Sequence, residues 1–250
     1  IKNYSHGMFE SVYDYPYLSS SANHIFDLSI GVSTNSGRLT ASSAMTGAKG
    51  DMYNELCQML AGYDTNGHIQ ELDVNGNFTT GSVYVDGSTM REVFIINFAR
   101  LLSKDEIQPA SGSFIAKFGV NSSSVDPMTQ KVILFDKDGT SGVKTNSPAG
   151  EFNTLYATAS YSGGGTSHPI NLAPVPAGLI FYQAGIAVVT ASIFMDVFNG
   201  EGADAAMDRP GGGSTRTIPA LFSQTNISGA CNALRNRMFD VDFNNTTELN

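Results

Sequence analysis

Apolar residues in this chain fall into short runs that alternate with polar residues or end in turn residues, a pattern typical of β-strands. Strands are predicted at 113–120 and 131–136, joined by a polar loop at 121–130. A further alternating strand is predicted at 151–161, and another at 238–243. The pattern therefore favours a mainly β protein.

The two most apolar segments are expected at the centre of the sheet. Residues 93–102 form a continuous apolar run interrupted only by Asn97 and Arg100, which suits a strand buried on both faces. Residues 179–195 have the same character and are expected to form central strands, with Gly185 at a bend or bulge.

Turn signals recur at close spacing between 63 and 92, where we expect hairpins. The signals are Asp64-Thr65-Asn66-Gly67, Asn75-Gly76 and Asp86-Gly87. The segments 69–72 and 78–85 lie between them.

Two helices are predicted. The first covers 48–62, with Asp51 in its first turn and Gly62 at its C-cap. Its apolar positions recur at helical spacing, at Met52, Leu56, Met59 and Leu60. The second covers 226–237, with Ile227, Cys231 and Leu234 on one face. Loops rich in Gly and Ser are predicted at 31–46 and 199–216.

The first twenty residues carry a dense aromatic cluster that has two interpretations. The cluster comprises Phe9, Val12, Tyr13, Tyr15, Pro16, Tyr17 and Leu18. Residues 1–20 form either an extended arm that packs on a neighbour or a first strand on the chain's own sheet. In total, about nine strands and two short helices predict a β-sandwich or barrel-like fold, in a single domain over 1–250.

The composition fits a protein whose surface is largely covered by partners. Of the 250 residues, 41% are hydrophobic and only 15% are charged, whereas about 25% is usual. The net charge of −9 and the lack of a Lys/Arg cluster argue against nucleic acid and anionic membranes as partners. No apolar run approaches the roughly 18 residues that span a bilayer.

The ends of the sequence suggest a piece of a longer polypeptide. The chain begins with Ile1 rather than Met, and the strand-like segment 239–243 runs into polar residues without a natural stop. We expect it to be the N-terminal part of a longer chain.

Candidate metal and redox residues are few. Asp136-Lys137-Asp138-Gly139 resembles the start of a calcium loop, but the twelfth position is Ser147, where an EF-hand needs a glutamate. An Asp-Gly turn is the preferred interpretation. Neither the cysteines, Cys57 and Cys231, nor the histidines, His6, His24, His68 and His168, have metal-ligand spacing. The cysteines are expected to be buried thiols rather than a disulfide.

No catalytic or cofactor-binding residue is assigned. A G-x-S-x-G nucleophile elbow is absent, and the segment 164–168 (Gly-Gly-Thr-Ser-His) reads as a flexible loop. The run 211–215 lacks the lysine of a phosphate-binding loop. The six Asn-x-Ser/Thr sequons are attributed to chance in a chain rich in these residues. A pair of catalytic carboxylates remains open among 23 acidic residues, although the absence of Trp disfavours sugar chemistry.

Several segments, in order, resemble virion structural proteins of large myoviruses, including marine phages related to the T4 group. The resemblance rests on 13–24, 106–109, 112–114, 136–139, 146–151, 178–189 and 243–248. The Ala110-Ser111 step before Gly112 departs from the commoner Pro-Gly-Ser-Phe form, which leaves the local turn geometry open.

The resemblance implies a structural part of a phage tail or baseplate, without cofactor or catalysis. It implies other virion proteins as partners, multiple symmetric copies, and a location in the virion after assembly in the host cytoplasm. Two alternatives stay open: a receptor- or glycan-binding β-sandwich of a tail fibre or tip, and an enzyme such as a cell-wall hydrolase.

Overall fold

A computed structural model of the chain describes residues 2–3, 9–14, 21–36, 44–78, 89–99, 105–119, 131–159, 174–194, 231, 234–235 and 238–246. The strands are β1 (Lys2–Asn3), β2 (Phe9–Asp14), β3 (Asn23–Val32), β4 (Glu92–Phe98), β5 (Glu106–Ile107), β6 (Phe114–Gly119), β7 (Lys131–Asp136), β8 (Phe152–Ala159), β9 (Val175–Phe181), β10 (Ile186–Thr190), β11 (Met238–Phe243) and β12 (Asn245–Thr246). The helices are α1 (Ala44–Leu60) and the 3₁₀ turns η1 (Gly139–Gly142) and η2 (Ala191–Phe194).

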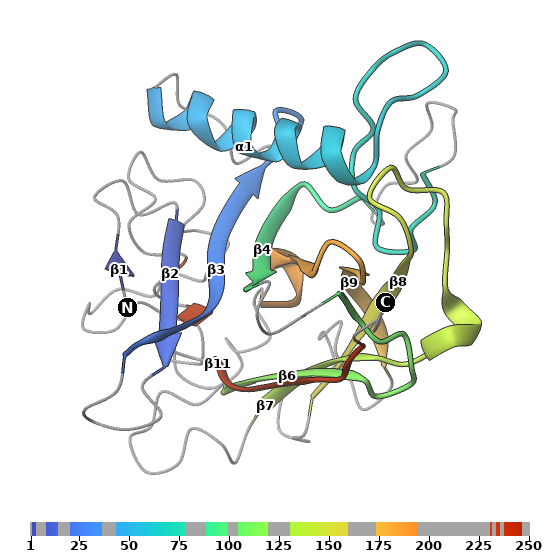
Figure 1. The fold of residues 1–250 in the computed structure, drawn as a ribbon. Helices are drawn as coiled ribbons and strands as arrows, with labels where there is room; N and C mark the ends of the chain where they lie inside the picture. The colour runs from blue at the N-terminus through green and yellow to red at the C-terminus, as the bar shows by residue number, and fades with distance from the viewer. Residues whose placement is uncertain are drawn as a thin grey trace.

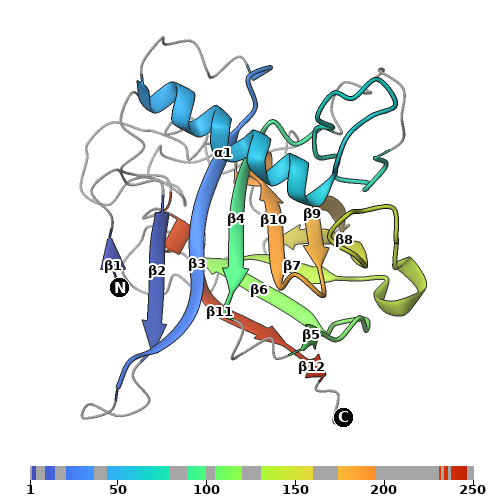
Figure 2. The same cartoon turned by 45° about the horizontal axis from the view of Figure 1, so that its top comes forward.

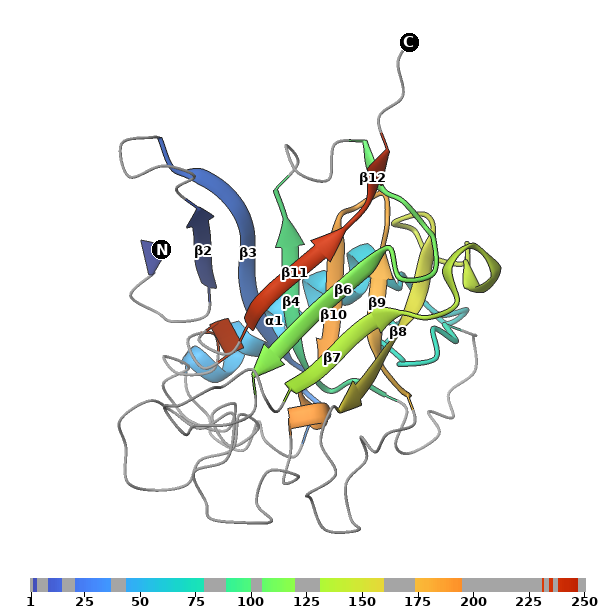
Figure 3. The same cartoon turned by 90° about the horizontal axis from the view of Figure 1, so that it is seen from below.

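Ten strands form one antiparallel sheet in the order β1-β2-β3-β4-β10-β9-β8-β7-β6-β11, and β12 pairs with β5 beside it. The sheet curls on itself, so that β6, β7 and β11 cross over the layer that contains β4 and β10 (Figure 3). The predicted mainly β, barrel-like or sandwich fold is confirmed.

The two central strands β4 and β10 separate two hydrophobic cores. Phe94 and Ile96 of β4 point into the core enclosed by the curled sheet. Val93 and Ile95 point to the opposite face, into a second core beneath α1. Alternate residues of β10 divide in the same way, with Val189 in the first core and Val188 in the second. The predicted burial of both faces is confirmed.

Helix α1 lies across the outer face of the sheet (Figures 1 and 2). Its buried side, formed by Tyr53, Leu56, Cys57 and Leu60, packs on β4, β9 and β10. The approach to β3 is close: a Cβ on Gly31 would lie 3.2 Å from the Cα of Tyr53. A glycine at this position therefore lets the helix backbone approach the strand.

The helix begins earlier than the pattern predicted, at Ala44 rather than at 48. Asp51 consequently lies in its interior, not its first turn. A Cβ on Gly50 would lie 3.3 Å from a methyl of Thr34, so close packing rather than helix propensity explains this residue in the helix. The predicted end is confirmed: Gly62 has φ +79° and donates its amide to the Cys57 carbonyl at 2.9 Å.

The first hairpin expected within 63–92 is present in short form: the antiparallel bridge Tyr63↔Ile69 closes the turn at 64–67, and the Gln70 amide donates to the Gly62 carbonyl at 3.0 Å. The turn at 73–76 is also present, with Gly67 and Gly76 at positive φ. Beyond it, the described residues of this region form the single bridge Asp73↔Thr89 rather than a longer ladder. The turn expected at 86–87 lies outside the described residues.

Several remaining predictions can be compared with the described residues. The strand at 9–14 is β2, which pairs with β3 on the chain's own sheet, the second of the two interpretations of 1–20. Gly185 has φ +67° in the turn between β9 and β10. Within the predicted helix 226–237, the described residues 231 and 234–235 are helical. In the described part of the chain, no helix is long and apolar enough to cross a bilayer.

Candidate functional site

Asp136, at the end of β7, is fully buried, and both oxygens of its carboxylate accept hydrogen bonds. Its Oδ1 accepts from the Gly139 amide and from the Asn153 side-chain amide, each at 3.0 Å. Its Oδ2 accepts from the Tyr182 hydroxyl at 2.5 Å. The same Asn153 nitrogen donates to the Gly139 carbonyl at 2.9 Å. Both carboxylate oxygens are thus occupied by the chain's own donors.

Glycine at 139 is required by this arrangement. Gly139 has φ +52°, and a Cβ there would lie 2.2 Å from the backbone nitrogen of Ser111. The segment 136–139 therefore turns its carboxylate inward and leads into η1, instead of presenting it to a cation or closing a two-residue hairpin. Among the described residues, no three His, Cys, Asp or Glu side chains lie together as a metal site requires.

Segments far apart in the sequence meet at Tyr182, which follows β9. Its amide donates to the Glu151 carbonyl at 3.1 Å, and its carbonyl accepts from the Ile107 amide at 3.0 Å. The Asp136 carbonyl in turn accepts from the Gly112 amide at 2.8 Å. We call Ile107, Gly112, Asp136, Asn153 and Tyr182 the buried corner, in which every residue except the exposed Gly112 is buried.

The buried corner has the electrostatics of a structural element. Burial raises the pKa of Asp136, while the hydrogen bonds from Tyr182 and Gly139 oppose that rise. Burial, then the neighbouring Asp136, raises the pKa of Tyr182 far above its ordinary value, so the phenol stays a proton donor. Both side chains are fully buried, and their hydrogen bond joins the end of β7 to the residue that follows β9.

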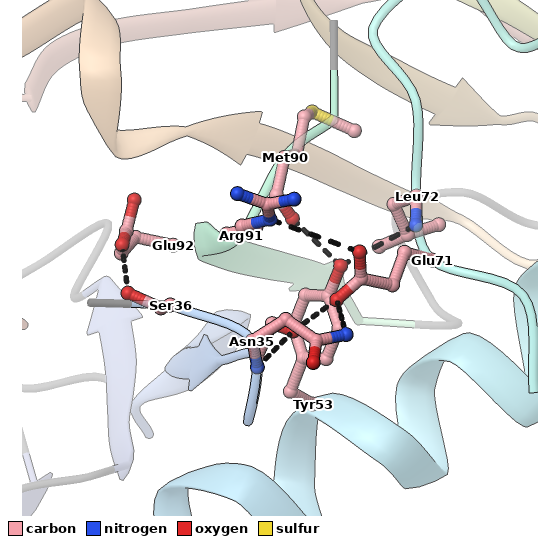
Figure 4. Close-up of polar contacts among 9 residues, drawn as sticks. Asn35, Ser36, Tyr53, Glu71, Leu72, Met90, Arg91 and Glu92 are labelled. Atoms are coloured by element: carbon pink, nitrogen blue, oxygen red, sulfur yellow. Dashed lines mark hydrogen bonds and ion pairs between the residues drawn. The ribbon is translucent and has the colours of Figure 1, made fainter. Parts of the chain in front are cut away.

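A second polar cluster joins α1 to the ends of β3 and β4 (Figure 4). Glu71, which follows α1, is 8% exposed, and its Oε1 accepts hydrogen bonds from the Ser33 hydroxyl and, at 3.1 Å, from the Asn35 amide. The Arg91 Nε lies 3.9 Å from Glu71 Oε2. The Ser36 hydroxyl donates to Glu92 at the start of β4.

Tyr53 anchors the same region from the helix (Figure 4). Its hydroxyl donates to the Met90 carbonyl at 2.7 Å and accepts from the Leu72 amide at 3.4 Å. Burial raises the pKa of Tyr53 well above its ordinary value. The cluster brings a serine, a carboxylate and a guanidinium together, but Ser33 is only 1% exposed. The hydrogen bonds of the cluster connect the turn after β3 to Glu71 and to the start of β4.

A third buried carboxylate, Glu10 of β2, lies beside the helical residues near 231–235. It is 1% exposed, and its Oε2 is 3.5 Å from the Arg235 guanidinium. Burial raises its pKa, while Arg235 opposes the rise. Among the described residues neither oxygen of Glu10 accepts a hydrogen bond. The pair connects β2 to the helical residues.

The residues considered for metal and redox chemistry lie apart. His24 contacts Asp27 at 2.8 Å, and His68 contacts Asp64 at 3.5 Å. Both cysteines are free and buried, Cys57 in the core beneath α1 and Cys231 in the core within the sheet. His6, His168 and the glycine runs at 163–165 and 211–213 lie outside the described residues.

The sequence patterns missed Glu10 and Glu71. Glu71 lies in the segment 69–72, Ile-Gln-Glu-Leu, which is predicted to form part of a hairpin. Two of its four residues are polar, so the pattern gives no signal that Glu71 is buried and needs a partner. Comparison with family models, with curated proteins and with solved structures gives no match for this chain.

Proposed function

We propose that this chain is a structural component of a tailed bacteriophage particle, in the tail or baseplate, and that it acts by assembling with other virion proteins. The proposal includes multiple symmetric copies, no nucleic acid or membrane as a partner, and no catalytic step. The proposal builds on the sequence resemblance, and the buried corner is the structural observation that supports it.

Four of the seven segments that carry the resemblance contribute to the buried corner. Residues 106–109 and 112–114 contribute Ile107 and Gly112, whose amides bond to the Tyr182 and Asp136 carbonyls. The third of these segments, 136–139, contributes Asp136 itself, and 178–189 contributes Tyr182. Similarities scattered along a chain by chance have no reason to converge on one buried hydrogen-bond network. This convergence supports a resemblance between folds, from which the shared role is inferred.

The chemistry of the described residues is consistent with an assembly role. The buried carboxylates Asp136, Glu71 and Glu10 contact donors or cations of the same chain. A chain with only 15% charged residues presents a surface of hydroxyl, amide and apolar groups, which suits extensive contacts with neighbours.

A cryo-EM reconstruction of the phage particle that encodes the chain tests the proposal. We expect density for the curled ten-stranded sheet at a position repeated by the symmetry of the tail or baseplate, together with peptides of the chain in mass spectra of the purified particle. Particles that lack the chain would overturn the proposal. Density at a fibre tip, with binding on a glycan array, would replace it with the receptor-binding alternative.

A further inference from the structure

Within the described parts of the chain, the edge strand β11 has a line of unpaired backbone groups. It is the terminal strand of the ten-stranded order and pairs only with β6 among the described residues. A register shift between Met238 and Asp240 leaves Phe239 as an extra residue. Beyond this bulge, Val241 and Phe243 pack against the core, so Asp240 and Asp242 lie on the outer face.

The alternation of antiparallel bonds fixes which groups face outward. The Asn244 amide donates to the Ser113 carbonyl at 2.8 Å, in the register that continues the β11–β6 pairing. Bonded pairs alternate along an antiparallel ladder, so Asp240 and Asp242 bond to β6. The N–H and C=O groups of Val241 and Phe243 consequently point to the open edge.

The charges beside this edge discriminate between possible partners. Asp240 lies opposite Lys117 of β6, with 2.5 Å between the lysine Nζ and the carboxylate, whereas Asp242 is exposed and lies opposite Ile115. A second copy of β11 could pair antiparallel at this edge with Asp242 opposite its own copy or opposite Asp240. In both pairings an aspartate faces an aspartate. Like charges directly opposite are destabilising, so the edge disfavours its own copy.

We propose that the open edge of β11 accepts a β-strand from another protein that carries lysine or arginine opposite Asp242. The added strand bonds to Val241 and Phe243, and its basic residue pairs with Asp242 as Lys117 pairs with Asp240. This proposal rests on the proposed assembly role, and it specifies the kind of segment that binds at one contact of the assembly.

Two capped peptides, one alternating lysine with valine and one alternating glutamate with valine, provide the test. They are titrated at low salt into the 250-residue chain, with the amide NMR signals of Val241 and Phe243 as the readout. We expect shifts from the lysine peptide and none from the glutamate peptide or from a lysine peptide with alternate backbone nitrogens methylated. Equal binding of both charged peptides, or binding of neither, would overturn the proposal.

Variants of the protein separate the ion pair from general charge attraction. Asp242→Asn should weaken binding of the lysine peptide by about two- to fivefold, and Asp242→Lys should transfer the preference to the glutamate peptide. Asp51→Asn, an exposed change on α1, is the matched control and should leave binding unchanged. An equal loss in Asp51→Asn would contradict the assigned edge. The particle reconstruction decides the assembly role separately, so failure of either proposal is recognisable.

Discussion

The Tyr182 hydroxyl donates a 2.5 Å hydrogen bond to Asp136, across 46 residues of sequence, and both side chains are fully buried. Replacing Tyr182 with Phe leaves the carboxylate oxygen without this donor. We expect the free energy of unfolding to fall by about 1.5–3 kcal/mol, the range for hydrogen bonds to charged groups. Urea unfolding followed by circular dichroism measures the change.

The matched control is Tyr63→Phe. The Tyr63 side chain is 56% exposed, and its hydroxyl accepts a hydrogen bond from Gln58 at the surface. Its loss should change stability by less than about 0.5 kcal/mol. Equal effects of the two substitutions would show that the buried corner does not stabilise the fold.

The stability contributed by Asp136 should decrease as pH rises. Burial raises its pKa above the ordinary value of 3.8, so the folded chain holds this proton more tightly than the unfolded chain. The difference in unfolding free energy between the wild type and Asp136→Asn should therefore be most favourable to the wild type below the ordinary pKa. It should decline as pH rises through the folded-state pKa. Urea unfolding at a series of pH values measures this difference.

Asp64 provides a comparison of opposite sign. The His68 and Asn66 amides, with the His68 side chain, lower its pKa. Its contribution should be present above the ordinary pKa and decline as pH falls through the folded-state value. If the Asp136→Asn difference instead grew with pH, the carboxylate would be better stabilised in the folded chain than its burial implies.

Gly178 of β9 should tolerate no side chain. A Cβ there would lie 2.2 Å from the Val188 carbonyl oxygen of the paired strand β10. Gly178→Ala should therefore force β9 and β10 apart and lower the unfolding free energy by about 3 kcal/mol. Thermal unfolding should show a clear drop in Tm.

The control for this substitution has the opposite expected sign. Gly47 lies exposed in α1, and a Cβ there would meet nothing within 4 Å. Gly47→Ala should stabilise the chain by about 0.5–1 kcal/mol, because alanine loses less conformational entropy in a helix. A neutral Gly178→Ala would contradict the close pairing of β9 and β10.

The two thiols should be inert in the folded protein. Burial raises the pKa of Cys57 to about 12 and also raises the pKa of Cys231. Because the thiolate is the reactive form, Ellman's reagent at about pH 8 should react slowly with the native chain. It should titrate two thiols per chain in guanidinium chloride. Rapid reaction of one thiol in the native state would show that its core opens locally.

The elements predicted best from sequence are those that neighbouring residues are sufficient to identify. The apolar run that became β4 indicated a strand covered on both faces, and the structure places a core on each side of it. Gly62 marked the end of α1, because the positive φ needed there favours glycine. Local composition was sufficient for both.

The segment after α1 was predicted less well, because its turns are local but its partners are not. Instead of a strand ladder, the Leu72 amide donates to the Tyr53 hydroxyl, and the Leu72 carbonyl accepts from the Met90 amide. Asp136 shows the same limit: its donors Asn153 and Tyr182 lie 17 and 46 residues away. A pattern of neighbouring residues contains no record of such partners.

The pairing of β11 with β6 has a consequence for how the chain folds. Lys117 and Asp240, which face each other across this pair, are separated by 123 residues. During synthesis, the edge of β6 that pairs with β11 therefore stays unpaired until more than a hundred further residues have left the ribosome. Contacts of such sequence separation slow folding and prolong the exposure of unpaired strands. We expect refolding in vitro to be slow, with aggregation at high concentration, and the yield to improve when chaperones shield the unpaired edge.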